Sequence, residues 1–341
     1  MYENLSDPMP VNKEIKLYSG TGNPALAEKI ADILHLELQG LNIEKFANGE
    51  IYARFTESVR GDDVYFIQTL AGANVNDLLM ETLIVCDAAK RASCNKFIAV
   101  IPHYGYARQD RKAAAREPIT ARLVANLLEA AGVDQVITVD LHQGQIQGFF
   151  DVPVTHLTAL FLLGDYFKKN KDLDWDNTVV VSPDMGRAKA AKKLSDYLGC
   201  DLAIAHKGRP KHNVSEVMGI IGDIKGKTCI VNDDMIDTAG TLCGSVKKLK
   251  EMGAGDIYVC ATHGIFSGPA IERLEEAPIE ECVVTDSVPQ PEENLTGKIN
   301  TISVANEIAE CISIANDCAE AIDSVYMNEP VSNIFGGGLN L

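Results

Sequence analysis

The chain has 341 residues and a formal net charge of −17, with 46% hydrophobic and 23% charged residues. These values are ordinary for a globular protein with room for two domains, and a general nucleic-acid binder would be basic. The nine cysteines include no Cys-x-x-Cys pair, which disfavours a disulfide framework or zinc ribbon. No signal peptide and no apolar run of the roughly 20 residues that span a bilayer is visible. We therefore expect a cytoplasmic protein with no membrane or nucleic-acid partner.

Short apolar segments alternate with amphipathic ones throughout the chain. This order predicts an α/β fold of mainly parallel sheets flanked by helices. The predicted strands are 15–19, 64–69, 97–102, 136–141, 178–182, 201–205, 228–232, 257–262 and 282–286. The predicted helices are 24–34, 76–92, 118–131, 187–198, 241–252 and 304–322.

A weak internal repeat relates the two halves of the chain. A shift of 121 residues brings Gly132 onto Gly253 and His142 onto His263, within one helix–Gly–strand–His unit in register. We interpret the repeat as two related α/β domains. The predicted domains are residues 1–160 and 161–341.

The first half carries a basic segment after an apolar strand. Arg108 and Arg111 have forked donors that suit phosphate oxygens, and Lys112 adds a point charge. Taken alone, the segment is about equally compatible with a solvated basic loop. A little further on, His142 closes a strand, where the spacing alone favours a core histidine over a metal ligand.

The second half carries a second basic segment, residues 206–212, directly after the strand 201–205. Five potential cations, two of them histidines, with Gly208 and Pro210 predict a mobile loop that closes on developing charge. The alternative is a solvated basic turn.

Residues 231–241, Val-Asn-Asp-Asp-Met-Ile-Asp-Thr-Ala-Gly-Thr, are the most informative segment. They follow an apolar strand and precede a helical pattern, so they predict a strand, a loop and a helix. The acids suit sugar hydroxyls or a metal, and the small residues open a helix whose backbone N–H groups suit an anion. The alternative is an acidic turn with an ordinary helix cap.

Several segments together resemble the ribose-phosphate diphosphokinases (PRPP synthetases), which have the type I phosphoribosyltransferase fold. Residues 231–241 resemble the family's ribose-5-phosphate loop, and Tyr-Ala-Arg-Gln-Asp at 106–110 its ATP-binding motif. Phe-Ala-Asn-Gly-Glu at 46–50 and the segment 140–151, which begins Asp-Leu-His, are similar to further family motifs. So are Ser-Pro-Asp-Met-Gly at 182–186 and Lys-Gly-Arg at 207–209.

This resemblance implies Mg²⁺-dependent transfer of the diphosphoryl group of ATP to the 1-hydroxyl of ribose 5-phosphate, giving PRPP and AMP. It also implies two phosphoribosyltransferase-like domains and a homohexamer. The implied ATP-binding residues are Phe46, Asn48, Glu50, Arg108, Gln109, Asp110 and His142. The implied ribose-5-phosphate-binding residues are Asp184, Asp233, Asp234, Asp237, Thr238, Ala239, Gly240 and Thr241. His142 and Asp184 are the implied metal ligands, and Lys207 and Arg209 the implied catalytic residues.

One segment departs from the family pattern. The usual Gly-Gly-x-Lys-Arg reads Gly186-Arg187-Ala188-Lys189-Ala190 here. The departure leaves open a catalytically silent, PRPP-synthetase-associated regulatory subunit. A type I phosphoribosyltransferase would share residues 231–241, but we would not expect it to carry the other motifs.

Overall fold

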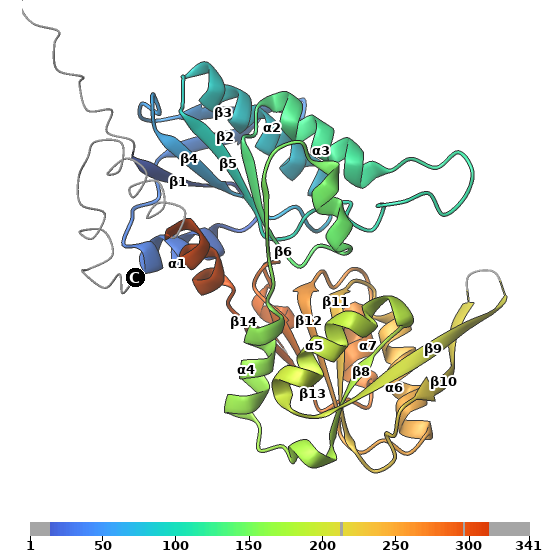
Figure 1. Cartoon of the computed structure of the whole chain (residues 1–341). Helices are drawn as coiled ribbons and strands as arrows, with labels where there is room; N and C mark the ends of the chain where they lie inside the picture. Colours follow the sequence, from blue (N-terminus) through green and yellow to red (C-terminus); the bar gives the residue numbers. More distant parts are fainter. Residues whose placement is uncertain (1–13, 212–213, 296, 314–341) are drawn as a thin grey trace, which may run out of the picture.

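The computed structural model describes residues 14–211, 214–295 and 297–313, with backbone alone at 207–211 and 214–218. Within these residues the chain forms a five-stranded sheet, a seven-stranded sheet and a two-stranded pair. Figure 1 shows the two larger sheets in separate halves of the molecule. The predicted α/β fold of two related domains with mainly parallel sheets is confirmed.

The first sheet is wholly parallel, with the order β1-β4-β5-β6-β7. Phe97, Ala99 and Ile101 pack on one face and Ile98 and Val100 on the other, so the sheet is buried on both sides. Its strands are β1 (Ile15–Ser19), β4 (Asp63–Ile67), β5 (Lys96–Ile101), β6 (Gln135–Val139) and β7 (Val154–Leu157). Helices α2 (Val75–Arg91) and α3 (Thr120–Ala131) cover one face, and α1 (Pro24–Leu34) the other.

The second sheet has the order β10-β9-β8-β11-β12-β13-β14, and only β10 runs antiparallel to its neighbour. Its strands are β8 (Thr178–Ser182), β9 (Asp201–Lys211), β10 (Val214–Ile221), β11 (Thr228–Ile236), β12 (Ile257–Gly264), β13 (Glu281–Thr285) and β14 (Ile299–Ile302). Helices α6 (Gly240–Glu251) and α7 (Ala270–Glu276) cover one face, and α4 (Leu160–Asn170) and α5 (Ala188–Leu198) the other. Short 3-10 helices lie at Gly144–Phe149, Trp175–Asn177, Met185–Arg187 and Glu292–Asn294.

The chain crosses between the sheets twice. It leaves the first sheet after β7 and joins the second through α4, so the crossing lies at residues 158–159. After β14 it returns, and residues 305–313 are helical and pack against the outer face of the first sheet. The predicted helix 304–322 lies outside the described residues beyond 313. The assignment of residues 1–160 and 161–341 to two domains stays a prediction.

Most predicted elements differ from the observed ones only at their ends, as α3 and β11 do, but the loop predicted from residue 206 was wrong. Helix α3 begins at Thr120, so Pro118 lies before the helix, and Ile119 is its N-cap. Strand β9 continues to Lys211 because it pairs with β10 in a hairpin, so residues 206–211 are strand and not loop. Strand β11 continues to Ile236 because β12 is long enough to pair with it.

The sequence patterns missed several elements. Strands β2 (Leu41–Lys45) and β3 (Ile51–Phe55) form a partly exposed antiparallel hairpin that packs on α2. Strands β7, β10 and β14 and helices α4 and α7 were also missed, since most are short and lie beside turns. The repeated glycines follow their helices in left-handed conformations, with φ of 107° at Gly132 and 89° at Gly253.

Buried polar contacts join the two domains. His263 on β12 is fully buried, and its Nε2 atom lies 3.1 Å from the carbonyl oxygen of Val139 on β6. The Thr69 hydroxyl donates to the carbonyl of Ser287 at 2.8 Å, and Asn23 donates to that of Asp286 at 2.8 Å. These bonds hold the carboxyl ends of both sheets against one another. None of the helices in the described part of the chain is long and apolar enough to cross a bilayer.

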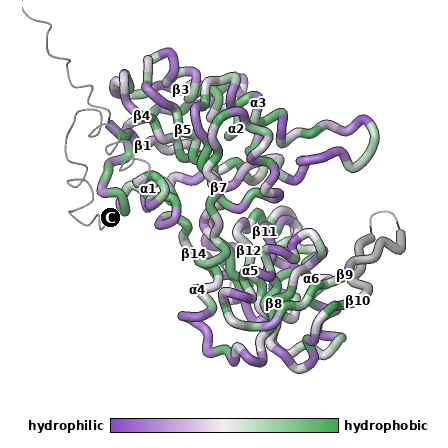
Figure 2. The backbone as a smooth tube through the Cα atoms, in the orientation of Figure 1, coloured by the Kyte–Doolittle hydropathy of each residue, from purple (hydrophilic) through white to green (hydrophobic). Residues whose placement is uncertain are grey.

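Figure 2 shows the hydrophobic residues concentrated along the strands, while the loop between β5 and α3 is largely hydrophilic. This loop and the β9–β10 hairpin project from the same side of the molecule, one from each domain. They are the two basic segments of the sequence, so two sources of positive charge flank the junction between the sheets.

Candidate active site

A cavity of about 610 Å³ lies at the carboxyl ends of the strands, where the two domains meet. Open α/β sheets bind their ligands at this edge. The first domain contributes Arg108, Arg111 and His142, and the second contributes Asp184, Arg187 and residues 233–242. The cavity therefore brings all of the predicted sugar-binding residues together with part of the predicted ATP-binding set.

The predicted sugar loop lines one wall of this cavity. Asp233 and Asp234 lie near the end of strand β11, and residues 237–239 lead into α6. Ala239 adopts a left-handed conformation with φ of 57° and is the N-cap of α6. The carbonyl of Thr238 accepts a 2.8 Å hydrogen bond from Arg273 Nη1, which holds the turn. The first N–H groups of α6 have no acceptor within the helix, so this end suits an anion.

A cluster of charges occupies the floor of the cavity. His142 Nδ1 lies 2.7 Å from Asp234 Oδ2, and Arg187 Nε lies 3.8 Å from an oxygen of each of Asp233 and Asp234. The hydrogen bond to Asp234 raises the pKa of His142 against the opposing effect of burial. Asp234 is only 2% exposed. Burial alone would raise its pKa, but the bond from His142 and the charge of Arg187 hold that pKa below its ordinary value.

Asp233 behaves oppositely to its neighbour. Burial and the adjacent carboxylate of Asp234 raise the pKa of Asp233, because two close carboxylates do not both ionise readily. The backbone N–H of Asp234 donates to Asp233 Oδ1 at 2.9 Å. One member of the pair is therefore held charged and the other favours its protonated form, a combination of acceptor and donor that suits sugar hydroxyls.

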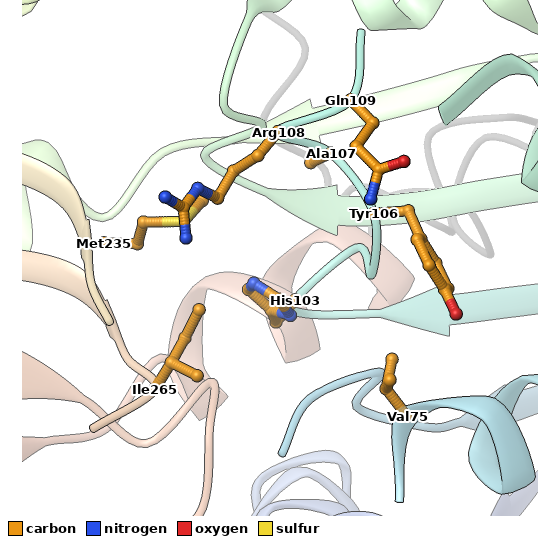
Figure 3. A pocket seen from close by; sticks show the side chains of 8 residues that line it. All are labelled: Val75, His103, Tyr106, Ala107, Arg108, Gln109, Met235 and Ile265. Atoms are coloured by element: carbon orange, nitrogen blue, oxygen red, sulfur yellow. The ribbon is translucent and has the colours of Figure 1, made fainter. Parts of the chain in front are cut away.

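The basic loop of the first domain reaches the sugar loop directly. Arg108 Nη1 donates to Asp237 Oδ2 at 2.6 Å. Arg108 also lines a second cavity of about 450 Å³, together with His103, Tyr106, Gln109 and apolar side chains. Figure 3 shows Arg108 extending alongside Met235, with His103 between the two domains. The two cavities share Arg108 and Met235, so they adjoin. Asp110 lines neither cavity, but its charge raises the pKa of His142.

The structure does not bring Phe46, Asn48 and Glu50 to either cavity. They lie at the turn of the β2–β3 hairpin, where Asn48 Oδ1 accepts from the Glu50 backbone N–H at 3.1 Å. The Phe46 ring is 50% exposed and contacts only the Tyr52 ring among described aromatic side chains, at 5.9 Å.

Lys207 and Arg209 lie on β9 in the hairpin of the second domain, where Lys207 pairs with Val217 and Gly208 with Glu216. Their backbone positions lie in the β9–β10 hairpin, which projects from the second domain (Figure 1). His206, the residue before them, lines the cavity. Their catalytic roles stay predictions.

The residues present fit a Mg²⁺ ion that is bound partly by substrate. No group of three or more His, Cys, Asp or Glu side chains in the described residues is arranged to hold a metal alone. Mg²⁺ commonly needs only one or two carboxylates and takes its other ligands from water and phosphates. Asp184 lines the cavity, and His142 keeps Nε2 available because Nδ1 faces Asp234.

The sequence patterns missed some residues of the site. Arg187 was seen only as part of a departure from a motif, yet it lies beside both carboxylates of the sugar loop. His103 lies in the second cavity, and its ring meets that of His263 edge to face at 4.7 Å. His263, which matches His142 in the internal repeat, is a buried and hydrogen-bonded side chain. These placements depend on contacts between residues that are distant in the chain.

Comparisons with known proteins agree with this architecture. A sequence model of the N-terminal domain of ribose phosphate pyrophosphokinase matches residues 15–132, and one of the phosphoribosyl synthetase-associated domain matches residues 209–335. A ribose-phosphate pyrophosphokinase of Clostridium acetobutylicum is 49% identical over 95% of this chain and 98% of its own length. One of Caldanaerobacter subterraneus is 54% identical over 87% and 93%, respectively.

A solved structure shows the same arrangement. The crystal structure of phosphoribosylpyrophosphate synthetase from Mycobacterium smegmatis matches with a TM-score of 0.82 and 44% identity, covering 93% of this chain and all of that one. The two α/β domains, with the predicted sugar loop of the second at their junction, thus define a phosphoribosyltransferase-like fold. At this level of identity over nearly the whole chain, the protein belongs to the ribose-phosphate pyrophosphokinase family.

Proposed function

We propose that this protein is an enzyme that transfers the diphosphoryl group of ATP to the 1-hydroxyl of ribose 5-phosphate, giving PRPP and AMP. The observation that carries the proposal is the shared cavity. The basic loop of the first domain and the acidic sugar loop of the second line the same space, and they touch through Arg108 and Asp237. Two anionic substrates can therefore meet there.

The transfer is a direct displacement. A bond forms between the 1-oxygen of ribose 5-phosphate and the β-phosphorus of ATP, the bond from that phosphorus to the α–β bridging oxygen breaks, and AMP leaves with that oxygen. The 1-hydroxyl proton is released. Such chemistry depends on positioning and charge neutralisation more than on a covalent protein nucleophile. A phosphorylated enzyme intermediate would contradict this step.

The side chains of the cavity divide the work of binding. The turn 238–241 at the start of α6 would hold the 5-phosphate. Asp233 and Asp234, with Asp237 beside them, would hold the ribose hydroxyls. Arg108, Gln109 and Asp110 would bind ATP, and Lys207 and Arg209 would stabilise the transferred charge.

Asp184 and His142 are the residues that would hold Mg²⁺ in this cavity. When bound with ATP, the ion would supply charge neutralisation at the phosphate oxygens. His142 is held for this role by Asp234, whose carboxylate fixes the ring through Nδ1.

The proposal needs a second subunit to account for Phe46, Asn48 and Glu50. Because they lie away from both cavities of their own chain, a second copy of the chain would bring them to the ATP site. This supports a homo-oligomer, and the resemblance makes it a hexamer. A cytoplasmic location is supported by the eight cysteines of the described residues, all of which are free.

The alternative of a silent regulatory subunit rests on the segment 186–190. Product analysis separates the two. Wild-type protein with ATP, Mg²⁺ and ribose 5-phosphate should yield AMP and PRPP, and Lys207→Ala should lose most of this activity while folding normally. Wild-type protein that binds ribose 5-phosphate but releases no AMP would favour the regulatory subunit.

A further inference from the structure

Arg187 places a positive charge in the wall of the larger cavity, where the resembling motif has a glycine. The same motif ends in an arginine three residues later, and this chain has Ala190 there. Positions 187 and 190 are one helical turn apart. The charge has therefore moved one turn toward the strand end, next to the sugar loop.

The guanidinium of Arg187 is close to acids without being bonded to them. Its Nε atom lies 3.8 Å from Asp233 Oδ1 and 3.8 Å from Asp234 Oδ1, beyond hydrogen-bond distance. Nε is buried and has no hydrogen-bond partner among the described residues. The backbone N–H of Arg187 donates to Asp184 Oδ1 at 3.2 Å, so the residue is anchored by its main chain.

A structural ion pair would have a different geometry. Arginine and carboxylate bonded to one another usually lie about 2.7–2.9 Å apart and often pair through two N–H groups. Here the side chain is 18% exposed and belongs to the cavity wall. Buried donors are normally satisfied, so one without a partner beside a cavity indicates a ligand that completes it. Five N–H donors in a rigid plane suit a phosphoryl group.

The cavity already has a place for one phosphate, the turn 238–241. A sugar carrying only the 5-phosphate would fill that place and leave Arg187 unpaired. The product carries a second anionic group on C1, beside the hydroxyls that Asp233 and Asp234 would hold. We propose that Arg187 binds oxygen atoms of this diphosphoryl group, a role that rests on the proposed function.

The position of Arg187 also reduces the repulsion between the diphosphoryl group and the nearby carboxylates. A diphosphoryl group next to two carboxylates is opposed by like-charge repulsion at short range. A cation between the acids and the diphosphoryl group offsets that repulsion for the phosphorylated product more than for ribose 5-phosphate. Arg187 thus discriminates between the two ligands.

Isothermal titration of the intact protein with each ligand tests this role. PRPP and ribose 5-phosphate are titrated separately, with and without Mg²⁺, into wild type, Arg187→Gly and Arg187→Lys. Lys189→Ala is the matched control, because it removes a positive charge from an exposed residue two positions away that lines neither cavity. Thermal unfolding of each variant confirms folding.

We expect Arg187→Gly to weaken PRPP binding by about 10- to 100-fold, which corresponds to the loss of charge-assisted bonds. Ribose 5-phosphate binding should change less than about threefold, and Lys189→Ala should bind both ligands as wild type does. Arg187→Lys keeps the charge without the planar fork, so its PRPP affinity should lie between those of wild type and Arg187→Gly. Should Arg187→Gly fail to fold, the comparison of Arg187→Lys with wild type tests the proposal.

Equal weakening of both ligands would overturn the proposal, since it would make Arg187 a counter-ion of the sugar loop. Unchanged PRPP binding in Arg187→Gly would overturn it as well. In either case wild type would still bind PRPP and release AMP, so the proposed function would survive. Wild type that does neither would remove both proposals.

Discussion

His142 and Asp234 are 92 residues apart in the sequence and lie in different domains, yet their side chains meet at 2.7 Å. The bond connects the loop after β6 with the end of β11. It holds Asp234 ionised and fixes the imidazole. A single contact thus aligns a candidate metal ligand of one domain with a predicted sugar-binding acid of the other.

Replacing Asp234 by Asn should impair activity strongly. The amide keeps the size of the side chain but removes the charge that pairs with His142 and would accept a sugar hydroxyl. Since a bond to a charged group contributes about 1.5–3 kcal/mol, kcat/KM for ribose 5-phosphate should fall by about 10- to 100-fold. Steady-state kinetics beside the exposed control Asp196→Asn checks this, and wild-type kcat/KM in Asp234→Asn would contradict the assigned role.

The buried pair His103 and His263 should make stability fall in acid. Burial and the neighbouring His103 lower the pKa of His263 from 6.5 to about 3, and burial lowers that of His103 despite its bond to Leu70 and the charge of Asp234. The unfolded chain takes up these protons near pH 6.5 and the folded chain does so only at lower pH. The contribution of the two neutral histidines to the free energy of unfolding is therefore complete above about pH 6.5, and it is lost as the pH falls toward about 3.

Urea unfolding at about pH 7 and about pH 5 measures this effect. His263→Gln should be less stable than wild type at the higher pH, yet lose less stability on going to the lower one. Comparing variants is necessary because His142, whose pKa is raised, acts in the opposite direction. His35→Asn is the control, since His35 is exposed and Asn also tolerates its left-handed backbone. An unchanged pH dependence in His263→Gln would contradict the account.

Asp140 should be a stability determinant at the junction of the domains. It has φ of 36°, and its Oδ2 atom accepts from the Ala159 N–H at 2.9 Å and the Thr262 hydroxyl at 2.6 Å. Asp140→Ala leaves both donors without this acceptor and should lower the free energy of unfolding by about 2–4 kcal/mol. Asp140→Asn, which keeps an oxygen and tolerates this backbone, should lose less.

Chemical denaturation compares these variants with Asp172→Ala, which alters an exposed acid. If Asp140→Ala were as stable as that control, the two bonds would contribute nothing to holding the domains.

Phe46 and Lys207 should act in different subunits of one active site. Phe46→Ala and Lys207→Ala should each be nearly inactive alone. After mixing and reassembly, some sites combine an intact Phe46 from one chain with an intact Lys207 from another, so activity should reappear. Assays of mixtures at varied ratios measure this, and no recovery on confirmed reassembly would show that a single chain supplies both residues.

The sequence predicted the domains' strands and helices well where apolar periodicity was strong, as in β1, α1 and β8. It also predicted the sugar loop, because adjacent acids followed by small residues at a strand end are typical of a loop that binds a sugar phosphate. It could not show that β9 continues through the basic segment, since that depends on pairing with β10. The sequence also could not predict the positions of Arg187 and His103, because both depend on contacts with residues distant in the chain.

The most direct test of the central claim follows the β-phosphate of ATP. With β-labelled ATP, Mg²⁺ and ribose 5-phosphate, we predict AMP and labelled PRPP in equal amounts, with no ADP. ADP together with unlabelled sugar phosphate would mean transfer of the γ-phosphate alone. That result would contradict diphosphoryl transfer in this cavity.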